Sequence, residues 1–289
     1  MSIKNSILGS IGSAETNVKR TGQKAAFSHL MQTLARLGYG VRGLIYITMG
    51  LLALSVALGK SGAPTDQQGA IAAIGKQPAG MALLWVVLIG LVCYSLWGVV
   101  RAIWDPFHKG HDTKGLLLRA GYLFSAVCYA FLVLPTYGFI TGAGRTAQSG
   151  AQTQQSMATI MSKSWGPWLV GLIGLVVVAV GLQQIYQGFK ASFDRQFQIY
   201  AMTAQEVKWA KQLGRLGTTA RGIVFVLVGA LVSLAAYHAN PSQPVGIDAA
   251  LKTLRNQPYG IWMLGIVAIG LMAFGVYSML SAAWFRLKR

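Results

Sequence analysis

The chain has 289 residues, of which 54% are hydrophobic and only 11% are charged, yet its formal net charge is +18. The charges lie almost entirely between six long apolar stretches, which are too many and too uniformly apolar to be buried together in a soluble chain of this length. Composition therefore excludes a soluble domain. The basic residues lie beside the apolar stretches, where anionic lipid headgroups account for them, so a nucleic-acid partner is not expected.

The six stretches define the predicted elements. A helix of about 20 residues is long enough to cross the ~30 Å hydrocarbon core of a bilayer. We expect an all-α membrane protein with six transmembrane helices, over residues 41–59, 81–103, 116–140, 167–189, 220–238 and 261–284.

Two motifs recur at a long fixed spacing. An Arg-x-Gly motif followed four residues later by Arg-Gly occurs at Arg36 to Gly43 and again at Arg215 to Gly222. A Gln-Pro-x-Gly motif occurs at Gln77 to Gly80 and again at Gln257 to Gly260. Such a period indicates repeated architecture.

A weaker third copy lies between these two. Arg119-Ala-Gly121 opens it, but Ser125 stands where the outer copies have Arg42 and Arg221. Three parallel two-helix repeats predict an approximate threefold pseudosymmetry axis along the membrane normal. The expected organisation is a flexible basic cytoplasmic arm over 1–26, repeats over 27–105 and 106–194, a cytoplasmic interfacial linker over 195–214, and a third repeat over 215–289.

The distribution of Lys and Arg predicts the orientation. Most of the 25 basic residues flank the termini and the even-numbered connections, while the odd-numbered connections hold Lys60, Lys76, Arg145, Lys163, Lys252 and Arg255. The positive-inside rule then places both termini in the cytoplasm.

Several short helices are expected outside the spans. Residues 70–74 and 249–254 occupy matched places before the Gln-Pro motifs, and Thr203 to Glu206 fits a capping box. Phe193, Phe197 and Tyr200 form a stripe typical of a helix in the headgroup layer.

Residues that could support catalysis are scarce. All seven acidic residues lie outside the apolar stretches or at their ends, and no nucleophile elbow or phosphate loop is present. We therefore expect neither an enzyme nor a cofactor. His108 and His111 are the weak candidates for a metal site, although a solvated loop explains them equally well. Cys93 and Cys128 are expected to be buried free thiols, the alternative being a disulfide or redox pair.

Two sets of residues are candidate functional sites. The three repeats would place basic residues in a cytoplasmic ring that could hold an anion or a lipid headgroup; its members are Arg36, Arg42, Arg119, Arg215 and Arg221. The alternative is that arginines at the span ends reach to the interface as anchors. A glycine face in the fourth span allows close helix packing, within the chain or in an oligomer; it comprises Gly171, Gly174, Gly181 and Gly188.

The repeated motifs resemble a bacterial integral-membrane family known as domain of unknown function 1206. The pattern Arg-x-Gly-Tyr-x-x-Arg-Gly at Arg36 to Gly43 and the Gln-Pro-x-Gly motifs carry this resemblance, which covers residues 34–286. The resemblance implies three two-helix repeats and location in the bacterial plasma membrane, but no activity.

Function is therefore open between two classes. The first hypothesis is a non-catalytic module that binds anionic membrane lipids, a second copy of itself or another membrane protein. The alternative is a channel or carrier for a small anion or an uncharged solute along the threefold axis.

Overall fold

The structure is a computed structural model. It describes residues 2–60, 65–105, 110, 112–142, 155, 157–190, 203–240 and 242–284. Side chains are described from residue 29 onward, apart from those of Lys114 and Leu117. His108, His111 and the stripe from Phe193 to Tyr200 lie outside the described residues.

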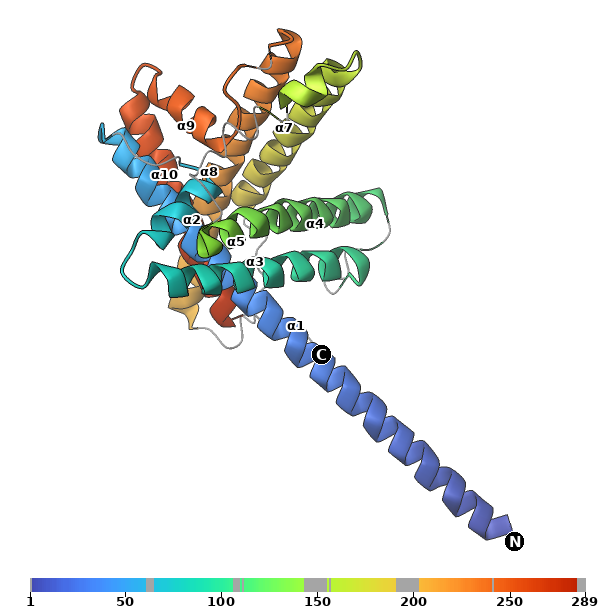
Figure 1. The fold of residues 1–289 in the computed structure, drawn as a ribbon. Helices are drawn as coiled ribbons and strands as arrows, with labels where there is room; N and C mark the ends of the chain where they lie inside the picture. The colour runs from blue at the N-terminus through green and yellow to red at the C-terminus, as the bar shows by residue number, and fades with distance from the viewer. Residues whose placement is uncertain are drawn as a thin grey trace.

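The described part of the chain is all helical (Figure 1). The helices are α1 (Ser2–Ala57), α2 (Gln67–Gly75), α3 (Gly80–Ile103), α4 (Thr113–Phe131), α5 (Val133–Thr141), α7 (Gly166–Lys190), α8 (Ala204–Tyr237), α9 (Ile247–Arg255) and α10 (Gly260–Trp284). Six segments are long and apolar enough to cross a membrane, namely His29–Ala57, Gly80–Ile103, Leu118–Thr141, Gly166–Lys190, Ala204–Tyr237 and Gly260–Trp284. The expectation of an all-α protein with six spans is confirmed.

The first helix is longer than expected. Residues 2–26, predicted to be a flexible arm, are helical and continuous with the first span, and this end of α1 projects away from the bundle in Figure 1. Extending an existing helix requires no new nucleus, and this segment contains no proline to stop it.

The third span is broken rather than continuous. Helix α4 ends at Phe131 and α5 begins at Val133, with Leu132 between them. Pro135 explains the position of this break. Its backbone nitrogen has no hydrogen to donate, and its ring clashes with the carbonyl four residues earlier, at Phe131.

The fifth span also begins early. Thr203 and Glu206 form the expected capping box, in which the Glu206 N–H donates to the Thr203 hydroxyl and the Thr203 N–H donates to the Glu206 carboxylate. The helix that starts there continues to Tyr237, so the second half of the linker predicted over 195–214 is the first part of α8.

Small residues set how the long helices pair. Figure 1 shows α7 lying beside α8 and α1 beside α10. A Cβ at Gly181 would lie 2.7 Å from the backbone nitrogen of Val226, and one at Gly174 would lie 2.9 Å from the carbonyl of Gly229. Three of the four predicted packing glycines, Gly174, Gly181 and Gly188, therefore pack against α8 of the same chain.

Helices α1 and α10 also pack closely through glycine residues. A Cβ at Gly43 would lie 2.7 Å from the carbonyl of Gly275, and one at Gly50 would lie 2.8 Å from that of Ala268. Each pair joins the second span of one repeat to the first span of another.

Within a repeat, the first and third copies agree and the middle copy differs. Gly38 faces Tyr94, and Gly217 faces Phe274, with a Cβ on either glycine 2.7 Å or less from the facing backbone. At the matching Gly121 of the middle repeat, a Cβ would meet nothing within 4 Å. The spans α4 and α7 accordingly diverge in Figure 1 rather than packing together.

The two short helices form on the side opposite the N-terminus. Asp66 caps α2 by accepting a hydrogen bond from the Gly69 N–H, and Asp248 in α9 accepts from the Thr65 N–H and hydroxyl. Burial raises the pKa of Asp66. Burial opposes ionisation of Asp248 too, but the bonds from Lys252 and Thr65 outweigh it and lower the pKa of that carboxyl.

Replacing Gly181 with alanine tests the close packing of α7 on α8. The added methyl meets backbone atoms, which cannot move aside, so Gly181→Ala should lower the free energy of unfolding by about 1–3 kcal/mol. Gly171→Ala is the matched control on the same helix, because its Cβ would lie 3.6 Å from Ala236, an ordinary contact. Thermal melting in detergent compares the two variants; equal melting temperatures would contradict this packing.

Asp66 provides a pH-dependent test. Because its folded pKa is raised, stability from this carboxyl is full below its unfolded pKa of about 3.9 and is lost as the pH rises through the folded pKa. Asn caps helices as well as Asp, so Asp66→Asn should gain stability relative to wild type as the pH rises from about 4 to 7. Asp66→Ala, which loses the cap, should be less stable than Asn by about 1 kcal/mol. Melting temperatures across this pH range measure both; a constant difference between Asn and wild type would refute the burial effect.

Candidate functional site

Three arginines from different spans gather around two aromatic rings. The Tyr94 ring on α3 lies 5.2 Å from the guanidinium carbon of Arg42 and 5.5 Å from that of Arg101. The Phe274 ring on α10 lies 4.9 Å from Arg42 and 5.0 Å from Arg221. Each ring therefore contacts two cations through its face, and together they connect all three arginines.

Arg42 lies in the interior of the bundle. Its side chain is 8% exposed, its Nη1 donates to the Tyr94 hydroxyl at 2.8 Å, and its Nε donates to the Ser278 hydroxyl at 3.1 Å. Arg42 is 15 residues from the end of α1 at Ala57, which is ~22 Å along the helix. The Arg42 side chain therefore turns into the bundle, where its hydrogen bonds are to residues of α3 and α10.

Arg101 has the least satisfied guanidinium. It is 6% exposed and lies over the rings of Trp97 and Tyr122, and its Nη1 has one long contact of 3.5 Å with the Tyr39 hydroxyl. Its Nε and Nη2 are buried without a hydrogen-bond partner. A buried donor without a partner costs about 1–3 kcal/mol and calls for an explanation.

Arg221 repeats this arrangement on α8. Its guanidinium lies over the rings of Tyr46 and Phe225, and its Nε is buried without a hydrogen-bond partner. The hydroxyls of Tyr46 and Tyr129 are buried without partners as well. Every repeat places an aromatic ring one helical turn beyond the position of this arginine. The ring is that of Tyr46 after Arg42, Tyr129 after Ser125 and Phe225 after Arg221.

The electrostatics of this arginine cluster (Arg42, Arg101 and Arg221) are unbalanced. Among the residues that the structure describes, no carboxylate contacts any of the three, and their partners are rings and hydroxyl groups. Arg groups can only donate hydrogen bonds, so their vacant N–H groups require an acceptor. Burying an ion without a counter-charge costs several kcal/mol. The arrangement can therefore bind an anion.

The structure brings only part of the predicted ring together. Arg42 and Arg221 join the cluster, whereas Arg36 and Arg215 are exposed. Arg119 donates instead to the carbonyls of Ala102 and Ile103 at the end of α3.

Sequence reasoning missed Arg101. It stands in the last turn of α3, three residues before Trp104, and therefore looked like an interfacial residue. Its only sequence signal is the Tyr94-to-Trp97 aromatic pair one to two turns earlier, which provides rings for its guanidinium.

The other candidate residues do not form a site in the described part of the chain. Cys93 is buried and Cys128 is exposed, and both are free thiols rather than a disulfide. No group of three metal-ligating side chains occurs among the residues described.

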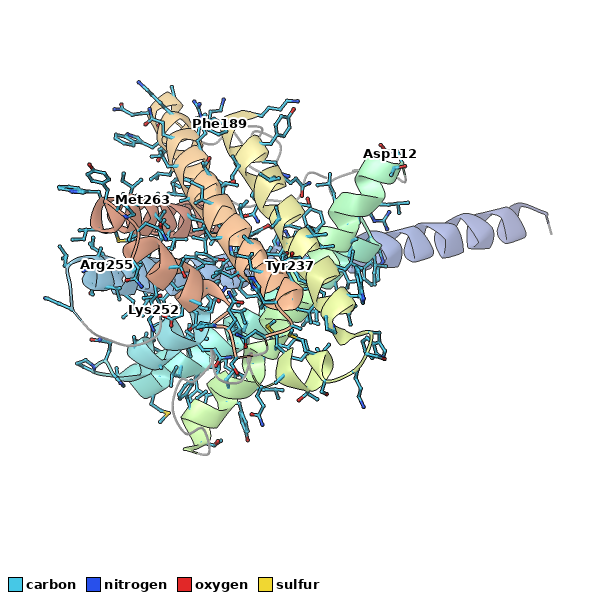
Figure 2. The ribbon with its side chains drawn as sticks, turned by 90° about the horizontal axis from the view of Figure 1, so that it is seen from above. Asp112, Phe189, Tyr237, Lys252, Arg255 and Met263 are labelled. Atoms are coloured by element: carbon cyan, nitrogen blue, oxygen red, sulfur yellow. The ribbon has the colours of Figure 1, made fainter. Side chains whose placement is uncertain are left out.

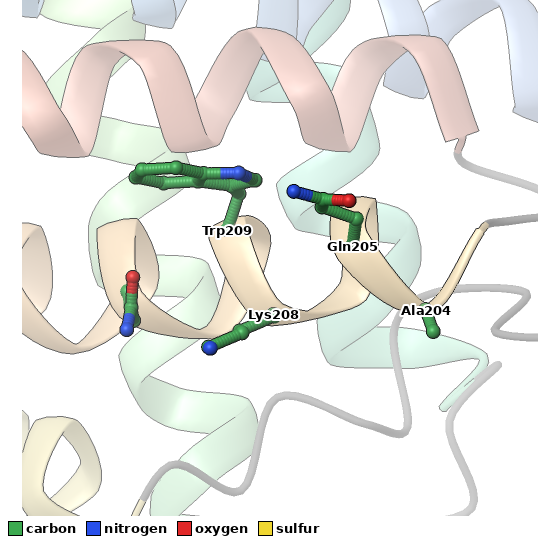
Figure 3. Close-up of a pocket in the computed structure, with 5 residues that line it drawn as sticks. Ala204, Gln205, Lys208 and Trp209 are labelled. Carbon is green, nitrogen blue, oxygen red and sulfur yellow. The ribbon is translucent and has the colours of Figure 1, made fainter.

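A surface hollow of about 560 Å³ lies along the first turns of α8 (Figure 3). Ala204, Gln205, Lys208, Trp209 and Gln212 line it. It shares no residue with the arginine cluster, and the Trp209 ring beside Lys208 is typical of a membrane interface.

The fold and the buried cluster define the class as a multi-pass helical membrane protein built from repeats. The chain belongs to the family described as Domain of Unknown Function (DUF1206), whose sequence profile matches residues 37–105, 120–191 and 216–285. The resemblance and the three-repeat organisation predicted from the motifs are confirmed. The uncharacterized protein YxxB of Bacillus subtilis (strain 168) is 33% identical over 254 residues, which cover 88% of this chain and 91% of the relative. No solved structure matches the chain.

Replacing Arg42 with lysine tests whether the cluster depends on guanidinium geometry. Lysine keeps the charge but loses the planar donors that reach both Tyr94 and Ser278, so Arg42→Lys should lower the free energy of unfolding by about 1–3 kcal/mol. The control is Arg215→Lys, because Arg215 is an exposed arginine of the same repeated motif. This substitution should change the free energy of unfolding by less than about 0.5 kcal/mol. Thermal melting in detergent compares the two variants. If Arg42→Lys lowers the melting temperature no more than Arg215→Lys does, the positive charge alone is sufficient at position 42.

Proposed function

We propose that this protein is a non-catalytic module of the bacterial plasma membrane that binds an anionic group, a lipid headgroup or a free anion, in the arginine cluster. The observation that supports this most directly is the set of vacant, buried donors on Arg101 and Arg221. A phosphate oxygen is the kind of acceptor that guanidinium groups bind most strongly.

The cluster also suits the proposed topology. With both termini in the cytoplasm, Arg101 in the last turn of α3 would lie near the cytoplasmic headgroups, and Arg42 and Arg221 one to two turns deeper. The cytoplasmic leaflet is rich in anionic lipid, and basic residues near it gain about 1 kcal/mol each. A parallel arrangement of the three repeats around an approximate threefold axis would explain why matched residues of repeats one and three meet.

Passage of a solute through the bundle is less well supported. On the side of the cluster away from the N-terminus, α1, α3 and α10 contribute large apolar side chains that are at most 1% exposed, namely Ile45, Met49, Leu91, Leu264 and Leu271. Such packing favours a closed binding site over a continuous pathway for a small anion or an uncharged solute.

Native mass spectrometry of the gently extracted protein tests the proposal. Wild type should retain an added mass that corresponds to an anionic species. Arg101→Gln/Arg221→Gln should lose at least about nine-tenths of that occupancy, since charge-assisted hydrogen bonds contribute about 1.5–3 kcal/mol each. The matched control is Arg215→Gln, which removes an exposed arginine and should retain the adduct.

Other outcomes would contradict the proposal. An adduct that persists in the double variant would place binding elsewhere, and a bare wild-type chain would favour transport, which liposome flux would then measure. An added mass equal to a second polypeptide would favour a homo-oligomer or a membrane-protein partner.

A further inference from the structure

One face of α4 lacks the cover that its counterparts have. Gly121, Ser125 and Cys128 are spaced by four and three residues and so lie on one side of the helix; we call this the α4 repeat face. The matching residues of α1 are Gly38, Arg42 and Ile45, and those of α8 are Gly217, Arg221 and Val224.

The matching faces of α1 and α8 are covered by the second span of their own repeat. Gly38 packs directly on Tyr94 and Gly217 on Phe274, and Ile45 and Val224 are fully buried. These contacts are what hold the first and second spans of repeats one and three together.

The α4 repeat face is bare in comparison. Gly121 and Cys128 are exposed, and no atom lies within 4 Å of a Cβ built on Gly121. Figure 2 shows the Asp112 end of α4 lying apart from the Phe189 end of α7, the span that would cover it. Exposed apolar side chains flank the face, including Leu123, Phe124 and Val127. In a membrane-spanning segment, such a surface meets lipid chains.

One of the arginines with vacant donors contacts α4 beside this face. The Arg101 guanidinium lies 4.6 Å from the ring of Tyr122, the residue next to Gly121. Arg221 belongs to the same cluster, because its guanidinium lies over the Phe274 ring that also contacts Arg42, and Arg42 in turn shares Tyr94 with Arg101. An apolar, open surface therefore adjoins buried donors that have no acceptor.

We propose that an anionic phospholipid occupies the α4 repeat face, with an acyl chain along Gly121, Ser125 and Cys128 and its phosphate bound by Arg101 and Arg221. This inference rests on the proposed anion binding and adds the ligand class and its lateral entry between α4 and α7. A phospholipid supplies both the chain and the phosphate, whereas a free anion leaves the face bare. A partner helix could offer a counter-charge only as a carboxylate within the membrane, where one is costly.

Photocrosslinking tests the inference on the full chain in vesicles. One sample contains phosphatidylglycerol with a diazirine in one acyl chain, and the other contains phosphatidylcholine with the same photoreactive chain at the same mole fraction. Labelled peptides are identified by mass spectrometry. Labelling between Gly121 and Cys128 should favour phosphatidylglycerol about fivefold, the effect expected of one basic residue near a phosphate. Equal labelling by the two lipids would overturn the inference.

Matched variants separate entry from binding. Gly121→Trp fills the bare face and should reduce phosphatidylglycerol labelling to the level of phosphatidylcholine, as should Arg101→Gln/Arg221→Gln. Gly265→Trp is the control, because a Cβ at Gly265 on α10 also meets nothing within 4 Å. If Gly121→Trp lowers the melting temperature, Gly121→Leu provides a smaller filler for the same comparison. Labelling that survives both fillers would contradict lateral entry.

The two proposals can fail separately. If wild type retains an anion that Arg101→Gln/Arg221→Gln loses, but both lipids label α4 equally, then anion binding holds and the lipid inference fails. Retention of inorganic phosphate in place of lipid by the extracted protein has the same meaning. Crosslinks to a second polypeptide at this face would replace the lipid with a protein partner. If neither the adduct nor the lipid preference depends on the arginines, both proposals fail.

Discussion

Three guanidinium groups, two of them buried, lie among the membrane spans with no carboxylate beside them in the described part of the chain, and the interior of this protein depends on how they are stabilised. When a cation is placed in a low-dielectric interior, contacts with the protein must compensate for the hydration free energy that it loses. Here Tyr94 and Phe274 present their faces to two arginines each, and hydroxyl groups accept two hydrogen bonds from Arg42. These contacts offset part of the cost, and the donors of Arg101 and Arg221 that remain vacant are the reason for assigning an anion to the site.

Glycine makes this arrangement possible. Only where a side chain is absent can Tyr94 and Phe274 approach the backbone of α1 and α8 closely enough to lie against the arginines one turn later. The repeated Arg-x-Gly-x-x-x-Arg pattern therefore couples close packing to a buried charge. The middle repeat keeps the glycine at Gly121 but has Ser125 in place of the second arginine, and its two spans do not meet there. Loss of the cation and loss of the packing coincide.

Much of the architecture could be predicted from the sequence, since spans depend on the local run of apolar residues. The capping box at Thr203, the short helices before the Gln-Pro motifs and the glycine face of α7 were all visible as local patterns, and the structure contains each of them. The helical state of residues 2–26 and the break at Leu132 were not anticipated. The first depends on propagation from a neighbouring span, and the second on the effect of Pro135 on a carbonyl four residues away.

The sequence by itself determined the class of protein, the family, the three repeats and the presence of arginines in matched positions, because these follow from composition and periodicity along the chain. Only the tertiary structure decided which arginines act together. Arg36, Arg42, Arg101 and Arg215 all look interfacial in sequence, yet the first and last remain exposed, while Arg42 and Arg101 turn inward to share Tyr94. The difference is physical: a guanidinium is buried only where helices from different repeats bring aromatic faces to it, and that depends on contacts between residues far apart in the chain.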